Sequence, residues 1–98
     1  MASTELRWHP AALREAEEAR DWYLARSPLA AHGFVASLSD AVEAVAATPV
    51  RWPVGRHGCR ERVFPNQYPY TLVYRVGPPV VVVAVAHQRR RPEFWRSR

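Results

Sequence analysis

The first half of the chain carries apolar residues at the spacing of α-helices. A first helix is predicted from Pro10 to about Arg26, because proline suits the first position of a helix. Its apolar face is narrow and consists mostly of small residues, at Ala12, Ala16, Ala19 and Tyr23. Another element can approach such a face closely. Before this helix, Thr4–Trp8 alternates loosely, which predicts a short first strand.

A second helix is predicted to begin at Ser27-Pro28, where a serine cap precedes a proline, and to end at Thr48-Pro49. Its apolar positions keep the helical spacing, at Phe34, Leu38, Ala41 and Val45. Almost nothing separates the two helices, so they are expected to form an antiparallel hairpin. Residues 49–58 hold two prolines and two glycines and predict a loop, with Trp52 packed on the core.

The second half changes to the two-residue period of β-strands. Strands are predicted at Cys59–Phe64, at Tyr70–Val76 and in the valine-rich run Val80–His87, joined by turns at residues 65–67 and 77–79. Alternation places Arg60 and Arg62 on one face of the first of these strands and Glu61 on the other. The valine run is apolar on both faces, so it is expected to lie in the middle of the sheet.

The element order is therefore β-α-α-β-β-β. It predicts one α+β domain over residues 1–98, with the helical hairpin packed on one face of a small antiparallel sheet. Because the central strand is apolar on both sides, something must also cover the second face of the sheet. The candidates are the C-terminal aromatic residues or a partner protein.

Charge is divided unevenly along the chain. Residues 1–48 hold four arginines against seven acidic residues, a net charge of −3, whereas residues 49–98 hold ten arginines against two glutamates, a net charge of +8. This asymmetry favours a polyanionic or acidic partner on one side of the molecule over a merely solvated basic face. The complete absence of lysine is explained by the codon usage of a GC-rich genome.

Composition argues against a disulfide-bonded, membrane-spanning, metal-binding or cofactor-binding protein. A single cysteine, Cys59, forms no internal disulfide and suits a cytoplasmic protein. No apolar stretch approaches the roughly 20 residues that span a bilayer, so no membrane partner is expected. The four histidines lie far apart without paired spacing, and no phosphate-binding glycine loop is present. We therefore expect no metal and no cofactor.

Candidate chemistry gathers near the end of the valine strand. Cleavage of RNA needs a base near neutrality and cations for the phosphate, which His87 with Arg60 and Arg62 could supply as catalytic residues. The alternative to a catalytic role is that His87 is a structural histidine at the end of the strand, hydrogen-bonded to a neighbouring carbonyl. For Tyr70 and Tyr74 the favoured interpretation is core packing.

The basic tail and its aromatic residues are the candidate surface for a partner. The residues expected to bind an acidic protein partner or a nucleic-acid target are Arg75, Arg89, Arg90, Arg91, Phe94, Trp95 and Arg96. The alternative for the three consecutive arginines is a solvated tail. Since Phe94 and Trp95 follow Pro92 and lack strand alternation, they are expected to dock back onto the fold.

Several segments together resemble the RelE/ParE superfamily, the toxins of bacterial type II toxin-antitoxin systems. The segments are His9–Ala12, Ala19–Tyr23, Pro49–Pro53, Pro69–Arg75 and, above all, Val85–Arg98. The resemblance runs nearly end to end. It implies a small cytoplasmic growth inhibitor that is neutralised by an antitoxin encoded beside it.

The superfamily implies two activities. RelE-like members cleave mRNA on the ribosome, whereas ParE-like members poison DNA gyrase without known catalysis. The long helical hairpin favours the ParE-like branch and a non-enzymatic gyrase poison. The alternatives are a ribosome-dependent endoribonuclease, towards which His87 and the arginines point, and a non-toxic interaction or nucleic-acid-binding module.

Overall fold

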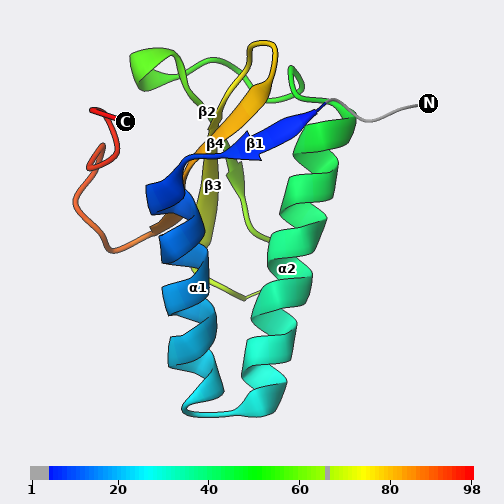
Figure 1. The fold of residues 1–98 in the computed structure, drawn as a ribbon, viewed down its shortest axis with the longest axis vertical. Helices are drawn as coiled ribbons and strands as arrows, with labels where there is room; N and C mark the ends of the chain where they lie inside the picture. Colours follow the sequence, from blue (N-terminus) through cyan, green and yellow to red (C-terminus); the bar gives the residue numbers. More distant parts are fainter. Residues whose placement is uncertain (1–4, 66) are drawn as a thin grey trace.

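The computed structural model describes residues 5–65 and 67–98, with the helical hairpin standing beside a small sheet (Figure 1). The elements are β1 (Leu6–Trp8), α1 (Pro10–Leu24), α2 (Pro28–Ala47), the short 3-10 turn η1 (Arg56–Gly58), β2 (Arg60–Val63), β3 (Tyr70–Arg75) and β4 (Val80–His87). The predicted order and the α+β class are confirmed. Thr4 of the predicted first strand and Asn66 of the predicted turn lie outside the described residues.

Both helices begin at the predicted prolines, and the structure adds a His9 cap for α1 to the predicted Ser27 cap of α2. The His9 side chain accepts a hydrogen bond from the Ala11 amide at 3.1 Å, and the Ser27 hydroxyl accepts one from the Ala30 amide at 3.2 Å. In each case a proline follows the cap. The alanine face of α1 is buried, at Ala12, Ala16 and Ala19. Two short caps and an intervening turn therefore produce the antiparallel hairpin.

The valine strand β4 lies inside the sheet, whose strand order is β1-β4-β3-β2. Strands β2, β3 and β4 form the predicted antiparallel meander. However, β1 runs parallel to β4, with Leu6 opposite Val80, so the expectation of a wholly antiparallel sheet is corrected. The reason is the connection: a tight hairpin forces antiparallel neighbours, whereas β1 reaches β4 only through both helices and two other strands.

A bulge interrupts the pairing of β3 with β4. Val73 lies opposite Ala84, but the next residue, Tyr74, lies opposite Val82, so Val83 is the extra residue. Val82 packs in the main core beneath the helices, whereas Val83 and Ala84 both belong to a smaller cluster on the second face. Beyond the bulge, the alternation of β4 residues between the two faces of the sheet is therefore shifted by one residue.

The main core is organised around the ring of Phe34, which is fully buried. Its centroid lies between 5.2 and 5.9 Å from the rings of four other aromatic residues, Tyr23, Phe64, Tyr68 and Tyr70. Tyr68 reaches this cluster by passing over Gly33, where a Cβ atom would lie 2.3 Å from the tyrosine oxygen. The same hydroxyl donates to the Ala30 carbonyl at 2.7 Å.

Trp52 is half-buried and packs against this main core, as the sequence predicts.

By length and composition α2 could cross a membrane, which departs from the sequence expectation. It has 20 residues, and the mean hydropathy of its most apolar window is 1.2. Core helices of soluble proteins meet the same criterion, so this is a weak indication. Five α2 residues are buried within the protein, at Ala31, Phe34, Ser37, Ala41 and Val45.

Candidate functional site

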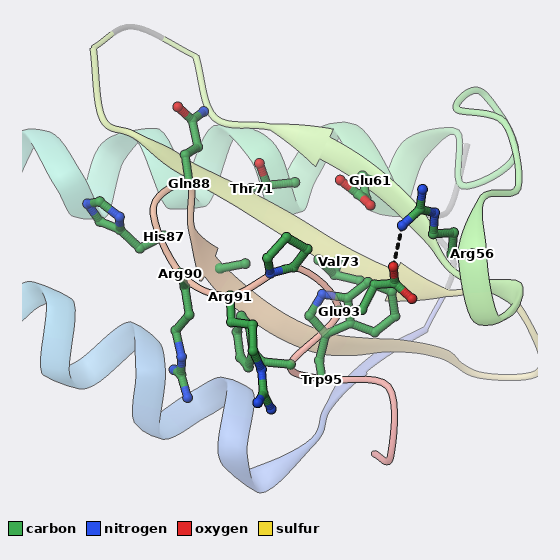
Figure 2. Close-up of a pocket in the computed structure, with 13 residues that line it drawn as sticks. Arg56, Glu61, Thr71, Val73, His87, Gln88, Arg90, Arg91, Glu93 and Trp95 are labelled. Atoms are coloured by element: carbon green, nitrogen blue, oxygen red, sulfur yellow. Dashed lines mark hydrogen bonds and ion pairs between the residues drawn. The ribbon is translucent and has the colours of Figure 1, made fainter.

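The C-terminal segment, residues 88–98, crosses the sheet face that the helices leave free (Figure 2). The Trp95 ring is only 4% exposed and packs with Cys59, Val73, Val83 and Ala84. The predicted docking of the C-terminal aromatic residues is therefore confirmed, and they are what covers the second face within this chain. Turns and bends replace regular structure from Gln88 onward, and Pro92 prevents a new strand within the segment.

An ion pair between Glu15 on α1 and Arg98 fastens the end of this segment. The two guanidinium nitrogens of Arg98 lie 2.9 and 2.7 Å from the two carboxylate oxygens, which is a bidentate arrangement. The same carboxylate accepts from the Val85 amide at 3.0 Å and, at 3.4 Å, from Arg90. The side chains of Glu15 and Arg98 are only 10% and 15% exposed. One largely buried carboxylate thus joins α1, β4 and the C-terminal segment.

A second contact holds the middle of the segment. Glu93 pairs with Arg56, and its other oxygen lies 2.5 Å from Nε2 of His57. Hydrogen bonds to His57 and Arg56 hold the pKa of the Glu93 carboxyl below its ordinary value. Among the described residues other than glycine, only His57 and Glu93 adopt a positive φ, at 58° and 60°. These two unfavourable backbone conformations face each other across the contact.

Two hollows flank the end of β4. The first, which we call the basic hollow, has a volume of about 340 Å³ and lies between the C-terminal segment and the second sheet face (Figure 2). Its charged lining comprises Arg56, Arg90, Arg91, Glu61 and Glu93, with His87 at its rim. Three arginines against two carboxylates, one of which is already paired, leave it net positive.

The second hollow, which we call the α1 groove, has a volume of about 570 Å³. It lies between α1 and the ends of β3 and β4, and its walls are largely aromatic, with Trp22, Tyr23 and Tyr70. The Trp22 side chain is 52% exposed, which is unusual for so large an apolar ring. His87 and Arg90 line both hollows, so they stand on the ridge between them.

His87 makes local contacts at the end of its strand. Its Nδ1 atom accepts a hydrogen bond from the Arg89 amide at 3.0 Å, and its ring stands edge-on to Tyr70 with centroids 5.0 Å apart. The backbone partner is therefore an amide rather than the carbonyl that the sequence interpretation named. Tyr70 and Tyr74 pack in the core as expected.

Arg60 and Arg62 do not converge on His87. Arg60 donates to the Trp52 carbonyl at 2.5 Å and to the Val50 carbonyl at 3.3 Å, so it supports the loop after α2. Arg62 donates to a backbone carbonyl and lies 5.4 Å from the Trp52 ring centroid. The strand register places the Cα atoms of Arg62 and Arg60 about 12 and 16 Å from that of His87.

The residues predicted to bind a partner divide into two groups. Arg89, Arg90, Arg91 and Arg96 are exposed. The others serve the fold: Trp95 is buried, Phe94 is half-buried beneath the guanidinium of Arg90, and Arg75 donates to the Arg98 carbonyl at 3.3 Å. The basic surface of the C-terminal segment is therefore formed by the four exposed arginines.

No group of three or more histidine, cysteine, aspartate or glutamate side chains in residues 5–65 and 67–98 is placed to hold a metal ion. Cys59 is a buried free thiol, and its burial raises the pKa of the thiol above the ordinary value.

Sequence reasoning missed Glu15, Arg98 and Trp22. Glu15 is one of several charged residues on α1 and carries no distinguishing local signal. Trp22 flanks the alanine face of α1. A large aromatic ring beside a face of alanines, near the end of a helix, was the one signal in the sequence that could have indicated this aromatic surface.

Comparison with known proteins identifies the family. The family model for the ParE toxin of the type II toxin-antitoxin system parDE matches residues 6–92. A search of curated proteins finds no match.

Two solved structures share the fold. A chain of the chromosomal ParDE toxin-antitoxin system from P. aeruginosa is similar with a TM-score of 0.68 and 18% identity, over 87% of this chain and 96% of that one. A chain of the toxin-antitoxin complex RelBE2 from Mycobacterium tuberculosis is similar with a TM-score of 0.60 and 21% identity, over 92% and 97%. The match over residues 6–92, together with the fold, means that this chain belongs to the ParE toxin family of type II toxin-antitoxin systems.

Proposed function

We propose that this protein is a cytoplasmic growth inhibitor that an antitoxin encoded in the adjacent gene holds inactive, and that it poisons DNA gyrase by binding to it. The observation that carries the proposal is the family match over residues 6–92. The basic half of the chain, with its exposed arginines, is suited to a target that handles nucleic acid and to an antitoxin with an acidic tail.

The geometry around His87 supports binding rather than catalysis. A ribonuclease needs a base, a phosphate clamp and an acid around one phosphodiester. Here Arg60 and Arg62 are engaged with backbone carbonyls, and the register sets both well away from His87. A protein that acts by contact area requires no such convergence.

One observation favours a ribosome-dependent endoribonuclease as the second candidate. His87 stands at the rim of the basic hollow, and Arg90 and Arg91 line the same space. These arginines, rather than Arg60 and Arg62, would then hold the phosphate. A nuclease would need the His87 side chain as its general base, whereas a gyrase poison would not.

Induced expression of a His87→Ala variant separates them. For a gyrase poison, we expect growth arrest within a few-fold of the unaltered protein, accompanied by broken DNA and an induced damage response. For a nuclease, loss of the general base should slow cleavage by about 10²–10⁴-fold and relieve the arrest. Primer extension on cellular mRNA reads out the difference, because codon-phased cuts that vanish in the variant would establish the nuclease.

The matched control is His32→Ala, which removes an exposed histidine from α2 and touches neither hollow. It should arrest growth like the unaltered protein in both cases. An unaltered protein that produces neither arrest, nor DNA breaks, nor cleaved mRNA would contradict toxicity and favour a non-toxic interaction module.

Binding of the antitoxin should depend on salt. We expect an acidic, partly apolar tail that is disordered when free and folds upon this protein. Raising the salt concentration from about 50 to 500 mM should weaken binding, since the contacts involve the exposed arginines, and the heat-capacity change should be negative. Isothermal calorimetry with the adjacent gene product measures both, and an affinity indifferent to salt would contradict this picture.

A further inference from the structure

A second group of arginines lies away from the C-terminal segment, around the ring of Trp52. Arg51 and Trp52 belong to the loop after α2, and Arg60 and Arg62 lie on β2, the outermost strand of the sheet. This loop is at the opposite end of the molecule from the turn of the helical hairpin (Figure 1). We call these four residues the Trp52 cluster.

The Trp52 cluster and the C-terminal segment lie on opposite faces of the sheet. Arg60 pairs with Tyr74 and Arg62 with Leu72, and both of those partners belong to the main core beneath the helices. Residues directly opposite each other in an antiparallel pair share a face, so the two arginines project on the helix side. Glu61 lies between them in the sequence but lines the basic hollow on the other face, so it does not neutralise them.

The Trp52 residue gathers the three cations. The Cζ atoms of Arg51 and Arg62 lie 5.2 and 5.4 Å from the centroid of its ring, within the range of a cation–π contact. Its carbonyl accepts from Nη1 of Arg60 at 2.5 Å. Three like charges are therefore held around one half-buried side chain, an arrangement that an anion would stabilise.

The charge and most of the hydrogen-bonding capacity of the cluster are unused. Within residues 5–65 and 67–98, none of its three arginines pairs with a carboxylate. Arg60 and Arg62 each donate through Nη1 alone. In the same part of the chain, Nε of Arg62 is the one buried side-chain nitrogen or oxygen without a hydrogen-bond partner. Free guanidinium forks of this kind suit an anion with several acceptor oxygens.

We propose that the Trp52 cluster binds the phosphate backbone of duplex DNA, so that the toxin contacts the DNA as well as the gyrase that holds it. The inference rests on the proposed function, which supplies a target that carries duplex DNA. Arg60 and Arg62 lie on one face about 7 Å apart along the strand, a spacing at which each can take a separate phosphate.

The state of the Trp52 ring favours a duplex over a single strand. Proteins that bind single-stranded nucleic acid stack the bases on open aromatic rings. Here the ring is half-buried and already in contact with two guanidinium groups. The cluster is thus equipped for phosphates and not for bases, and its binding should be independent of sequence.

The test measures how the affinity for DNA depends on salt. Fluorescence anisotropy of a short labelled duplex is followed with the full-length protein and with the double variant Arg51→Gln/Arg62→Gln. Loss of two phosphate contacts should reduce the slope of log affinity against log salt by about 2, and should weaken binding on the order of 50-fold at about 0.1 M salt. The matched control, Arg14→Gln/Arg26→Gln, also removes two exposed arginines, one of them stacked on a tryptophan, and should leave the slope unchanged.

Two single variants guard against a misfolded double variant. The exposed side chain of Arg51 contributes only its ring contact, so Arg51→Gln should fold normally and reduce the slope by about 1. Arg62→Lys keeps the charge and should retain most of the slope. Equal losses in the two double variants would overturn the site, because they would reflect net charge alone.

Other probes decide the class of the occupant. Tighter binding to a single-stranded RNA of the same length than to the duplex would overturn the choice of duplex DNA. The same holds if Arg51→Gln/Arg62→Gln loses binding to a polyglutamate peptide but not to DNA, because the cluster would then be a surface for an acidic protein.

Purified gyrase separates this inference from the proposed function. If the unaltered toxin traps cleaved DNA on gyrase while the Trp52-cluster variant binds DNA normally, the DNA site is wrong and the gyrase proposal stands. If the toxin binds the duplex through the Trp52 cluster yet leaves gyrase unaffected, the DNA site stands and the gyrase proposal is wrong.

Discussion

Replacing Glu15 by alanine is expected to lower the free energy of unfolding by about 3–4 kcal/mol. Removing one partner of a largely buried ion pair leaves the other charge uncompensated, and here that charge is the guanidinium of Arg98. The Val85 amide loses its acceptor at the same time. Urea denaturation measures the loss, which should lower the melting temperature by roughly 15–25 °C in a domain of this size.

Glu18→Ala is the matched control, since it removes an exposed glutamate from the same helix. Its effect should stay within about 0.5 kcal/mol. A loss below about 1 kcal/mol for Glu15→Ala would mean that water replaces the carboxylate at the edge of β4. The ion pair would then be incidental to the position of the C-terminal segment.

Replacing Trp95 by alanine is expected to cost about 3 kcal/mol, because it deletes the largest side chain in the smaller core cluster. The bulged residue Val83, its neighbour Ala84 and the thiol of Cys59 would lose their cover. Thermal and urea unfolding of the purified protein measure this change. The variant should also bind apolar dyes, as the second sheet face becomes exposed.

The neighbouring substitution Arg96→Ala serves as the control, because that side chain is exposed and isolated surface charges contribute little. It should alter stability by no more than about 0.5 kcal/mol. An unchanged melt for Trp95→Ala would contradict the docked segment and assign the ring to an interface with a partner.

Both substitutions weaken the attachment of the C-terminal segment to the sheet. The exposed arginines Arg89, Arg90, Arg91 and Arg96 lie on a segment that has no regular secondary structure of its own. Contacts at Trp95, Glu93 and Arg98 therefore hold the basic surface against the sheet. A variant that releases the segment should weaken partner binding without altering any residue that contacts the partner.

Local chemistry in the sequence determined the helices and the three later strands. A serine followed by a proline starts α2, because the hydroxyl caps the first free amides and proline needs no donor there. Alternation in β3 separates Leu72 and Tyr74 on one face from Val73 on the other, and the structure shows that the first face meets the helices. These features depend on residues a few positions apart, so periodicity reports them directly.

Long-range pairing was decided only by the tertiary structure. No local signal states that β1 lies parallel to β4, or that Val83 bulges and shifts the faces of its strand. The meeting of Glu15 with Arg98, and of Trp22 with the end of β4, depends on how the hairpin packs against the sheet. Sequence periodicity defines which face of an element is apolar, whereas the contacts between distant elements follow from the packing that buries those faces together.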